Sequence, residues 1–446
     1  MSDKEYDNLI LGGGVAGLAA ARFLLQNHKT ILLLEKESQT GGNCRTNEHK
    51  GFRFDTGAHR LHDKIPEVTH WLKEMLGSDL RQVDIPSQIY HEGRYLQFPI
   101  QARGLLRVLG VRKTVLAVLS LMFNRGISNT PATNFKKHAI ATYGNQIAGT
   151  FLLNYSRKLW GTNCSQLSPT ISGNRLKGLM PLDLLKAFFS VNSKADRHMD
   201  GRFYYPRFGI GQIAECLTTS IGSENILCNA KVTAIQHEMN RIAAVEVNGE
   251  ENFTADYFVN TIPLKRFIQI LTPTPSASIL KAAASLKYRD IILVACFLKG
   301  KSVTRAATVY FPDEKFPFTR IYEPILRSKD MAPKGYTSLV LEYPCNEGEY
   351  LEPDSLCHLE ETARNHLTEL GWITADQVVD FKTSRMPAAY PVLGLAMEKN
   401  AQLCRDYLDG FFNLRTSGRV GSFTYSWIHD HISSSMDIAK RWAHEQ

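Results

Sequence analysis

Three glycines near the N-terminus have the spacing of a phosphate-binding turn. Gly12, Gly14 and Gly17 fit the pattern G-x-G-x-x-G. In such a turn the first glycine permits a tight bend, the second lets the backbone approach a pyrophosphate, and the third lets a helix pack closely on a strand. Glu35 lies 18 residues after the last glycine (35 − 17), near the spacing of a carboxylate that accepts hydrogen bonds from a ribose. These residues predict a dinucleotide site, and the alternative is a glycine-rich turn without a ligand.

The residues around this turn predict the elements that must position it. Apolar residues 9–11 predict a short buried strand, residues 18–25 a helix with few polar side chains, and residues 31–34 a second strand that ends at Glu35. The order of strand, turn, helix and strand strengthens the prediction, because the helix N-terminus then offers unpaired N–H groups to the phosphates.

Length and composition limit the class of protein. A chain of 446 residues, with 43% hydrophobic and 22% charged residues, predicts two or three globular domains. No apolar run approaches the roughly 20 residues that a membrane-spanning helix needs, and no apolar core of a secretory signal follows the acidic residues at the start. Eight cysteines without a C-x-x-C pair favour reduced thiols and a cytoplasmic location. The net charge of +8 is modest and no basic block indicates nucleic-acid binding.

Two further glycine loops follow the first one. Gly41-Gly42-Asn43 precedes Arg45, whose charge can offset that of a phosphate, and Gly57 leads to His59 and His62. The plainer interpretation of both histidines is a hydrogen-bonded loop. We expect no metal site, because no third ligand is near them in the sequence.

The rest of the chain divides into helix-rich and strand-rich stretches. Residues 89–99 predict a hairpin that turns at Glu92-Gly93, and residues 101–185 predict helices. We expect the apolar face near residues 105–119 to be buried, the alternative being a helix on a membrane surface. The clusters at residues 155–161 and 173–175 fit either solvated turns or the lining of an anionic pocket. Residues 291–297, 308–311 and 338–343 predict an antiparallel sheet, and a closing helix is predicted near Asp430.

An α/β pattern returns at residues 202–263, so the nucleotide-binding domain is expected to be discontinuous. We predict an α/β fold with a doubly wound, Rossmann-like domain made of residues 1–85, 207–263 and 384–446. A helical domain is predicted at residues 101–185. An antiparallel or mixed β-sheet domain on the substrate side is predicted from residues 86–100, 186–206 and 264–383.

Several blocks together resemble the FAD-dependent UDP-galactopyranose mutases, a family within the amine oxidase and protoporphyrinogen oxidase group of flavoproteins. They are Gly41-Gly42-Asn43, Gly57-Ala58-His59, Phe98-Pro99, Lys158-Leu159-Trp160, Tyr205-Pro206, Tyr310-Phe311-Pro312, Pro317-Phe318-Thr319-Arg320, Tyr390-Pro391, and Gly418-Arg419-Val420-Gly421 followed by Tyr425. The blocks occur in the family's order along nearly the whole chain.

The resemblance implies an enzyme that interconverts the pyranose and furanose forms of a nucleotide sugar for cell-surface polysaccharides. It implies FAD in its reduced form, with an adduct between flavin N5 and the sugar, and a UDP-sugar as substrate. We also expect a homodimer. Two alternatives remain: an FAD oxidoreductase such as an oxidase or desaturase, and a flavoprotein that binds a nucleotide sugar without reaction. No second dinucleotide fingerprint points to a nicotinamide reductant.

The resemblance also implies roles for individual residues. Arg175 and Arg320 would hold the diphosphate, since arginine is always charged and offers a planar fork of donors, and His59 would lie beside the flavin ring. The residues implied for substrate binding are Phe98, Gln101, Trp160, Tyr310, Tyr390 and Tyr425. Those implied for FAD are Gly12, Gly14, Gly17, Glu35, Gly42, Asn43, Arg45, Gly57, His59, Val232, Arg419, Gly421, Asp430 and Ser433.

Overall fold

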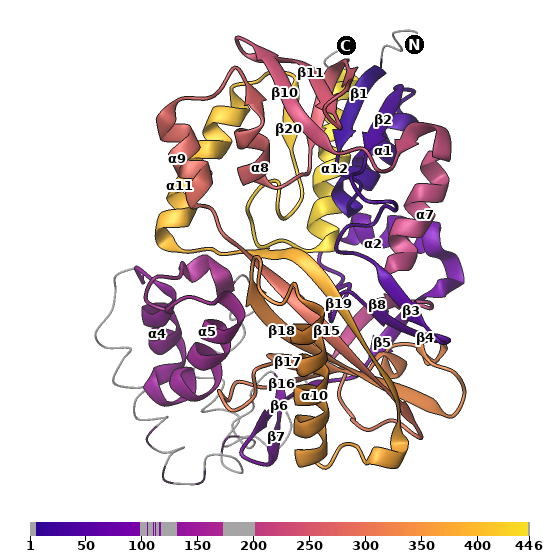
Figure 1. The fold of residues 1–446 in the computed structure, drawn as a ribbon, viewed down its shortest axis with the longest axis vertical. Helices are drawn as coiled ribbons and strands as arrows, with labels where there is room; N and C mark the ends of the chain where they lie inside the picture. Colours follow the sequence, from indigo (N-terminus) through magenta and orange to yellow (C-terminus); the bar gives the residue numbers. More distant parts are fainter. Residues whose placement is uncertain are drawn as a thin grey trace.

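The computed structural model of the chain describes residues 6–98, 105, 110, 112, 116, 132–172 and 201–444. In Figure 1 the upper half carries both termini at the top, and a large sheet crosses the lower half with helices α4 and α5 beside it. The mixed α/β fold confirms the predicted fold class.

A parallel sheet forms the centre of the upper half. Its order is β20 (Leu414–Thr416), β13 (Ala255–Asn260), β1 (Tyr6–Leu11), β2 (Ile31–Leu34) and β9 (Ile226–Leu227). The two strands predicted at residues 9–11 and 31–34 are confirmed. Residues 226–227 pair with β2 at the edge of this sheet, and not with the strands at residues 232–238 and 241–247.

Side chains alternate between the two faces of this sheet, and different elements pack against each face. Ile10, Leu33 and Val259 pack with the helices α1 (Val15–Gln26), α7 (Gly211–Ile221), α2 (Pro66–Leu76) and α12 (Ile428–His444). Leu9 and Leu34 face the other way, toward a small sheet with the order β12 (Glu251–Phe253), β11 (Arg241–Val247), β10 (Val232–Glu238) and β14 (Leu271–Thr272). Helices α8 (Leu264–Gln269), α9 (Ala277–Ser285) and α11 (Leu395–Asp409) pack beside it.

The lower half is organised by a mixed sheet of seven strands. Its order is β19 (Val378–Pro391), β15 (Tyr288–Lys299), β18 (Tyr336–Asn346), β17 (Arg320–Tyr322), β16 (Thr308–Tyr310), β6 (Ser87–His91) and β7 (Arg94–Phe98). The predicted hairpin is confirmed, with Glu92 and Gly93 at positive φ in its turn. All pairings are antiparallel except that of β16 with β6.

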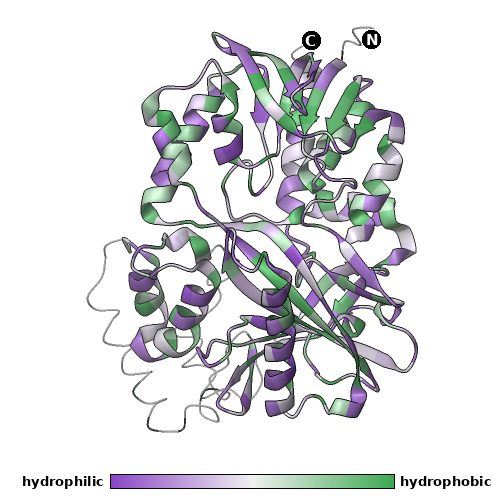
Figure 2. Cartoon of the chain, viewed as in Figure 1, coloured by the Kyte–Doolittle hydropathy of each residue, from purple (hydrophilic) through white to green (hydrophobic). Residues whose placement is uncertain are grey.

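Side chains along the central strand β15 alternate between the two faces of the sheet, and each face packs against a different part of the molecule. Ile292 and Val294 pack with α10 (Pro353–Glu369), which lies in front of the sheet and turns its hydrophilic side outward in Figure 2. Leu293 and Phe297 face the upper half, where Phe297 contacts Phe52 with 4.6 Å between ring centroids. Phe52 lies on β4 (Phe52–Asp55), which pairs with β3 (Thr46–His49), and a second two-stranded sheet joins β5 (Leu80–Asp84) to β8 (Arg202–Pro206).

Helices cover the end of the sheet near β16. Helix α4 (Phe135–Ile147) bends at Gly144 and continues through a π-helical segment, η2 (Ala148–Leu153), into α5 (Asn154–Trp160). Helix α5 ends at Gly161, which has φ +61° and where a Cβ would lie only 2.6 Å from Arg289 Nη1. The residues predicted as a helix at 105–119 lie almost entirely outside the described part of the chain. No described helix is long and apolar enough to cross a membrane.

Candidate active site

The first glycine turn is built to leave space above the N-terminus of α1. Gly12 has φ +105°, and a Cβ at Gly17 would lie 2.0 Å from the Gly12 carbonyl oxygen, so the helix lies directly against the turn. A Cβ at Gly14 would meet no atom within 4 Å. The helix has neither a side-chain cap nor an acidic residue in its first turn. Its N–H groups therefore face open space that suits an anion.

Glu35 lies at the rim of this space and its carboxylate is held by backbone groups. The side chain is 6% exposed, with Oε2 accepting from Gly13 N–H at 2.7 Å and Oε1 from Glu37 N–H at 2.9 Å. An ionised carboxylate offers about four acceptor positions, so capacity remains for ribose hydroxyls. Val232, buried at the start of β10, lies close by, since Ala230 N–H donates to the Glu35 carbonyl.

The second glycine loop packs on the first. Gly41 N–H donates to the Gly13 carbonyl at 2.8 Å, and a Cβ at Gly42 would lie 3.1 Å from Gly14 Cα. Asn43 Nδ2 donates to the Pro387 carbonyl on β19 at 3.0 Å, which ties this loop to the large sheet. Arg45 turns back on its own loop and donates to the Thr40 and Gln39 carbonyls.

His59 occupies the loop after Gly57 and faces three arginines. Its Nε2 is buried without a hydrogen-bond partner among the described residues. Burial, followed by the charges of Arg419, Arg320 and Arg327, lowers the pKa of His59 to about 3. The imidazole is therefore neutral at physiological pH and presents one unpaired nitrogen to the site.

Strand register places three polar side chains in a row across the large sheet. Tyr310 on β16 lies opposite Arg320 on β17, and Arg320 lies opposite Glu342 on β18. Arg320 Nε donates to Glu342 Oε2 at 2.5 Å, and its Nη2 donates to the Tyr390 hydroxyl at 3.2 Å. Glu342 Oε1 accepts from Ala58 N–H at 2.8 Å, so one carboxylate joins the arginine to the loop of His59.

Arg320 keeps its charge although it is almost fully buried. Burial is the largest single influence and lowers the pKa of the guanidinium, but the Glu342 carboxylate and the tyrosines Tyr390, Tyr155 and Tyr310 together raise this pKa well above its usual range. Its Nη1 has no hydrogen bond to a described residue. Tyr155 from α5 approaches from the other side, with its ring 5.8 Å from that of Tyr310. The row thus presents a fixed cation flanked by phenolic hydroxyls, an arrangement suited to an anionic group.

Aromatic rings form the neighbouring wall. Trp160 lies 5.9 Å from Tyr390 and 5.5 Å from Tyr425 between ring centroids. The Arg419 guanidinium lies over the Tyr390 ring at 5.2 Å and the Tyr425 ring at 5.9 Å. Arg419 also donates to the Ala389 and Ser426 carbonyls, which fixes it between β19 and the start of α12.

The remaining predicted residues line the edges or lie outside the described chain. Gly421 has no room for a Cβ, which would lie 2.3 Å from the Ser417 carbonyl oxygen. Asp430 Oδ2 accepts from Trp427 N–H at 2.8 Å and so caps the start of α12, one turn before Ser433. Phe98 packs on Tyr310 with 5.5 Å between rings. Gln101 and Arg175 lie outside the described residues.

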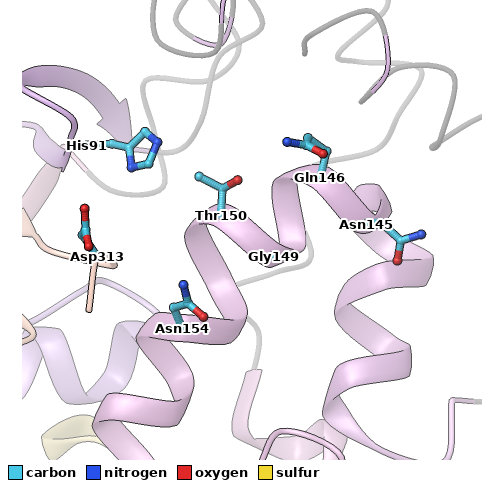
Figure 3. Close-up of a pocket in the computed structure, with 7 residues that line it drawn as sticks. All are labelled: His91, Asn145, Gln146, Gly149, Thr150, Asn154 and Asp313. Atoms are coloured by element: carbon cyan, nitrogen blue, oxygen red, sulfur yellow. The ribbon is translucent and has the colours of Figure 1, made fainter. Parts of the chain in front are cut away.

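A polar cavity of about 370 Å³ lies along the helical segment from α4 to the start of α5. Figure 3 shows Thr150 and Asn154 projecting from the helix on the side where His91 and Asp313 lie. The remaining lining residues are Asn145, Gln146 and Gly149. Amide, hydroxyl and carboxylate groups dominate this lining, which suits a polar ligand better than a hydrocarbon. None of these residues belongs to the row of Arg320 or to the glycine turns. Among the described residues no group of three His, Cys, Asp or Glu could hold a metal ion.

The sequence model of one family, the flavin containing amine oxidoreductases, matches residues 15–298, more than half of the chain. The chain belongs to this family. As an amine oxidoreductase family member it is a flavoprotein, and the residues above fit the cofactor: open space at Gly14, free N–H groups at α1, the Glu35 carboxylate and the unpaired Nε2 of His59.

Known relatives of this family member include both isomerases and oxidoreductases. A UDP-galactopyranose mutase of Mycoplasma pneumoniae is 25% identical over 186 residues, 38% of this chain and 44% of that protein. An L-amino acid oxidase of Bothrops pictus is 24% identical over 350 residues, 69% of this chain and 66% of that protein. The chain therefore matches less than half the length of the curated mutase, and only 10% of an inactive all-trans-retinol 13,14-reductase of Danio rerio.

Solved structures share the fold over the whole chain. The structure of a reduced UDP-galactopyranose mutase is 19% identical and covers 99% of this chain and 96% of its own, with a TM-score of 0.86. A putative protoporphyrinogen oxidase from Exiguobacterium sp. 255-15 is 16% identical over 100% of both chains, with a TM-score of 0.77. The family and this fold confirm the resemblance stated from the sequence.

Two residues of the site, Glu342 and Arg327, were missed by sequence reasoning, and the role of a third, Tyr155, was left open. Glu342 has no motif of its own, and only the register of β18 against β17 brings it to Arg320. Arg327 donates to the His59 carbonyl at 2.8 Å from a stretch that carries no recognisable signal. Tyr155 was noted within a basic and aromatic cluster, and the helical position of that cluster decides which side chain faces the site.

Proposed function

We propose that this chain is a nucleotide-sugar mutase that interconverts the pyranose and furanose forms of a UDP-sugar, for precursors of cell-surface polysaccharide. The observation that carries the proposal is the buried Arg320 in a row with Tyr310 and next to Tyr390. A permanent cation among hydroxyl groups favours a diphosphate and disfavours a hydrocarbon. The shared fold with a reduced UDP-galactopyranose mutase supports the same choice.

Each residue of the row has a distinct task in this proposal. Arg320 holds the diphosphate through Nη1 and Nη2 while the bond to the sugar is broken, because charge that develops on a departing group must be stabilised in place. The hydroxyls of Tyr310 and Tyr390 donate further hydrogen bonds to the phosphate oxygens. Glu342 orients the guanidinium by accepting a hydrogen bond from Nε, while Nη2 donates to the Tyr390 hydroxyl.

The aromatic wall and His59 orient the sugar. Trp160 and Tyr425 flank the space next to Arg320 and exclude water on that side. His59, neutral and unpaired at Nε2, accepts a hydrogen bond at the flavin loop without adding charge to it. Reduced FAD, when bound, supplies the nucleophilic nitrogen of this chemistry.

We further propose that two residues outside the described part complete the substrate site. Arg175 would supply the second diphosphate contact and Gln101, with Phe98, would hold the nucleoside. This assignment follows from the resemblance in sequence, and alanine substitution of Arg175 is expected to weaken UDP binding without loss of FAD.

An amine oxidase activity is the second candidate, favoured by the family and by the aromatic trio of Trp160, Tyr390 and Tyr425, since aromatic rings bind cationic ligands. Arg419 argues against it. Its guanidinium already lies over two of these rings at 5.2 and 5.9 Å, and a second cation there would be repelled.

The two candidates are separated by one paired experiment. FAD-loaded protein, either oxidised or reduced with dithionite, is incubated with UDP-galactofuranose, and the products are resolved by chromatography. The proposal predicts UDP-galactopyranose from the reduced sample alone. Absence of conversion in both samples, together with peroxide release from an amine by the oxidised sample, would assign the chain to the oxidases.

A further inference from the structure

A single lysine fastens the loop between β16 and β17 to the helical segment. This loop runs from Phe311 to Thr319, and Phe311 N–H closes it by donating to the Thr319 carbonyl at 2.8 Å. Lys158 on α5 reaches into it. Its Nζ lies within hydrogen-bond distance of four backbone carbonyl oxygens, which share its three N–H donors: those of Phe311 at 2.5 Å, Asp313 at 2.8 Å, Phe316 at 2.9 Å and Phe318 at 3.1 Å.

The four carbonyl oxygens require the charged form of this lysine. An ammonium group has three N–H donors and no lone pair, whereas a neutral amine would have to turn its lone pair toward one of the oxygens. Burial lowers the pKa of Lys158 to about 7. The carbonyl oxygens favour the ammonium form and so oppose this effect of burial, as does the nearby Asp313 charge, and the loop in turn packs around the ammonium.

The loop is attached directly to the proposed diphosphate site. Tyr310 precedes it and Arg320 follows it, so a shift of the loop moves both side chains. The helix on the other side of the clamp carries Tyr155 and Trp160. The ring of Tyr155 lies 5.8 Å from that of Tyr310, so these two elements face each other across the site.

The backbone of Lys158 is itself fixed to the large sheet. Arg289, buried on β15, donates through Nη2 to the Lys158 carbonyl at 3.3 Å and through Nε to the Leu159 carbonyl at 3.2 Å. A cation at a helix C-terminus also complements the helix dipole. These bonds hold helix α5 in one position relative to β15, and the Lys158 side chain in turn holds the loop in position relative to α5.

We propose that Lys158 is a positioning residue that sets the distance between α5 and the β16–β17 strands. Through this distance it sets the affinity of the site for a nucleoside diphosphate. This inference rests on the proposed function, since it assigns a diphosphate to that site. It goes further by naming a residue that acts through Tyr310 and Arg320 without touching the substrate.

The test compares FAD-loaded wild type with Lys158→Met, which keeps the length of the side chain and removes every donor. We expect the Kd for UDP to rise about tenfold. This is the effect of weakening the contacts of Tyr310 and Arg320 with UDP by the free energy of roughly one charge-assisted hydrogen bond. Backbone amides of residues 311–320 should exchange with deuterium faster, and kcat at saturating UDP-sugar should fall because Tyr310 and Arg320 are displaced, while FAD content stays close to wild type. Lys158→Gln replaces Lys158→Met if the latter does not fold.

Lys315→Met is the matched control, because Lys315 lies in the same loop but pairs on the surface with Glu369 of α10. It should leave the Kd for UDP and the exchange of residues 311–320 unchanged. The inference is overturned if Lys158→Met binds UDP as wild type does, or if its loss of affinity comes with a general loss of FAD and of protection throughout the chain. A wild type that binds no UDP overturns the proposed function instead.

Discussion

Replacing Arg320 by Met separates the stabilising role of the buried ion pair from its role in binding. The Arg320 side chain is 11% exposed and that of Glu342 is 0% exposed, with 2.5 Å between Nε and Oε2. Removing one partner of such a pair leaves a buried charge without compensation and costs about 3–5 kcal/mol of unfolding free energy. The affinity for UDP should fall as well, by about tenfold to a hundredfold, since hydrogen bonds to a charged group contribute about 1.5–3 kcal/mol.

The double variant Arg320→Met/Glu342→Gln decides between the two roles. Neutral side chains of similar volume remove the uncompensated charge, and the amide oxygen introduced by Glu342→Gln would still accept from Ala58 N–H, so stability should return to within about 2 kcal/mol of wild type. The affinity for UDP should stay as low as in the single variant, because the cation is still missing.

Urea unfolding of the FAD-loaded proteins, followed by circular dichroism and tryptophan fluorescence together, gives the free energies where the two transitions coincide. Calorimetric titration gives the Kd for UDP. Lys315→Met, which removes an exposed ion pair, should leave both quantities unchanged. The reasoning is refuted if the double variant is no more stable than Arg320→Met, or if it binds UDP as wild type does.

Three further predictions follow from the glycine turn and the flavin loop. Gly14→Val should fold with the stability of FAD-free wild type, because its Cβ enters open space, but it should lose FAD absorbance and the stabilisation that bound FAD gives; retention of FAD would contradict the placement of the pyrophosphate. Gly17→Ala should lower the unfolding free energy by about 1–3 kcal/mol, since its Cβ would meet the Gly12 carbonyl at 2.0 Å, and an unchanged midpoint in urea would contradict this packing. The pKa of His59, lowered by burial and neighbouring arginines to about 3, lies below its unfolded value near 6.5, so the unfolded chain binds the proton first and stability should fall as pH decreases from about 6.5 toward 3. His59→Asn should show a shallower fall in urea titrations across this range, and an identical slope would contradict the burial of His59.

The nucleotide-binding turn could be predicted from the sequence because its physics is local. Gly12, Gly14 and Gly17 are constrained by contacts within one strand, turn and helix, and spacing alone specifies such a unit. The hairpin at Glu92-Gly93 was predictable for the same reason, since the turn residues set the pairing of the strands beside them.

The row of Tyr310, Arg320 and Glu342 could be predicted only in part. Tyr310 and Arg320 were assigned by resemblance, but their contact with Glu342 depends on the register between β17 and β18, which lie about 20 residues apart and are aligned by burial over the whole sheet. The acceptors around Lys158 are backbone carbonyl groups. Because every residue carries one, the sequence does not indicate which of them Lys158 contacts. The domain boundaries and the role of Arg175 stay predictions.

Conversion of nucleotide sugars by reduced protein tests the central claim most directly. FAD-loaded protein reduced with dithionite is offered UDP-, dTDP- and GDP-sugars in turn, and each mixture is analysed for a product whose sugar ring has changed size. The account predicts such a product with a UDP-sugar, its absence with oxidised protein, and its loss in the folded Arg320→Met/Glu342→Gln variant. Reduced wild type that holds FAD and converts none of these sugars would contradict it.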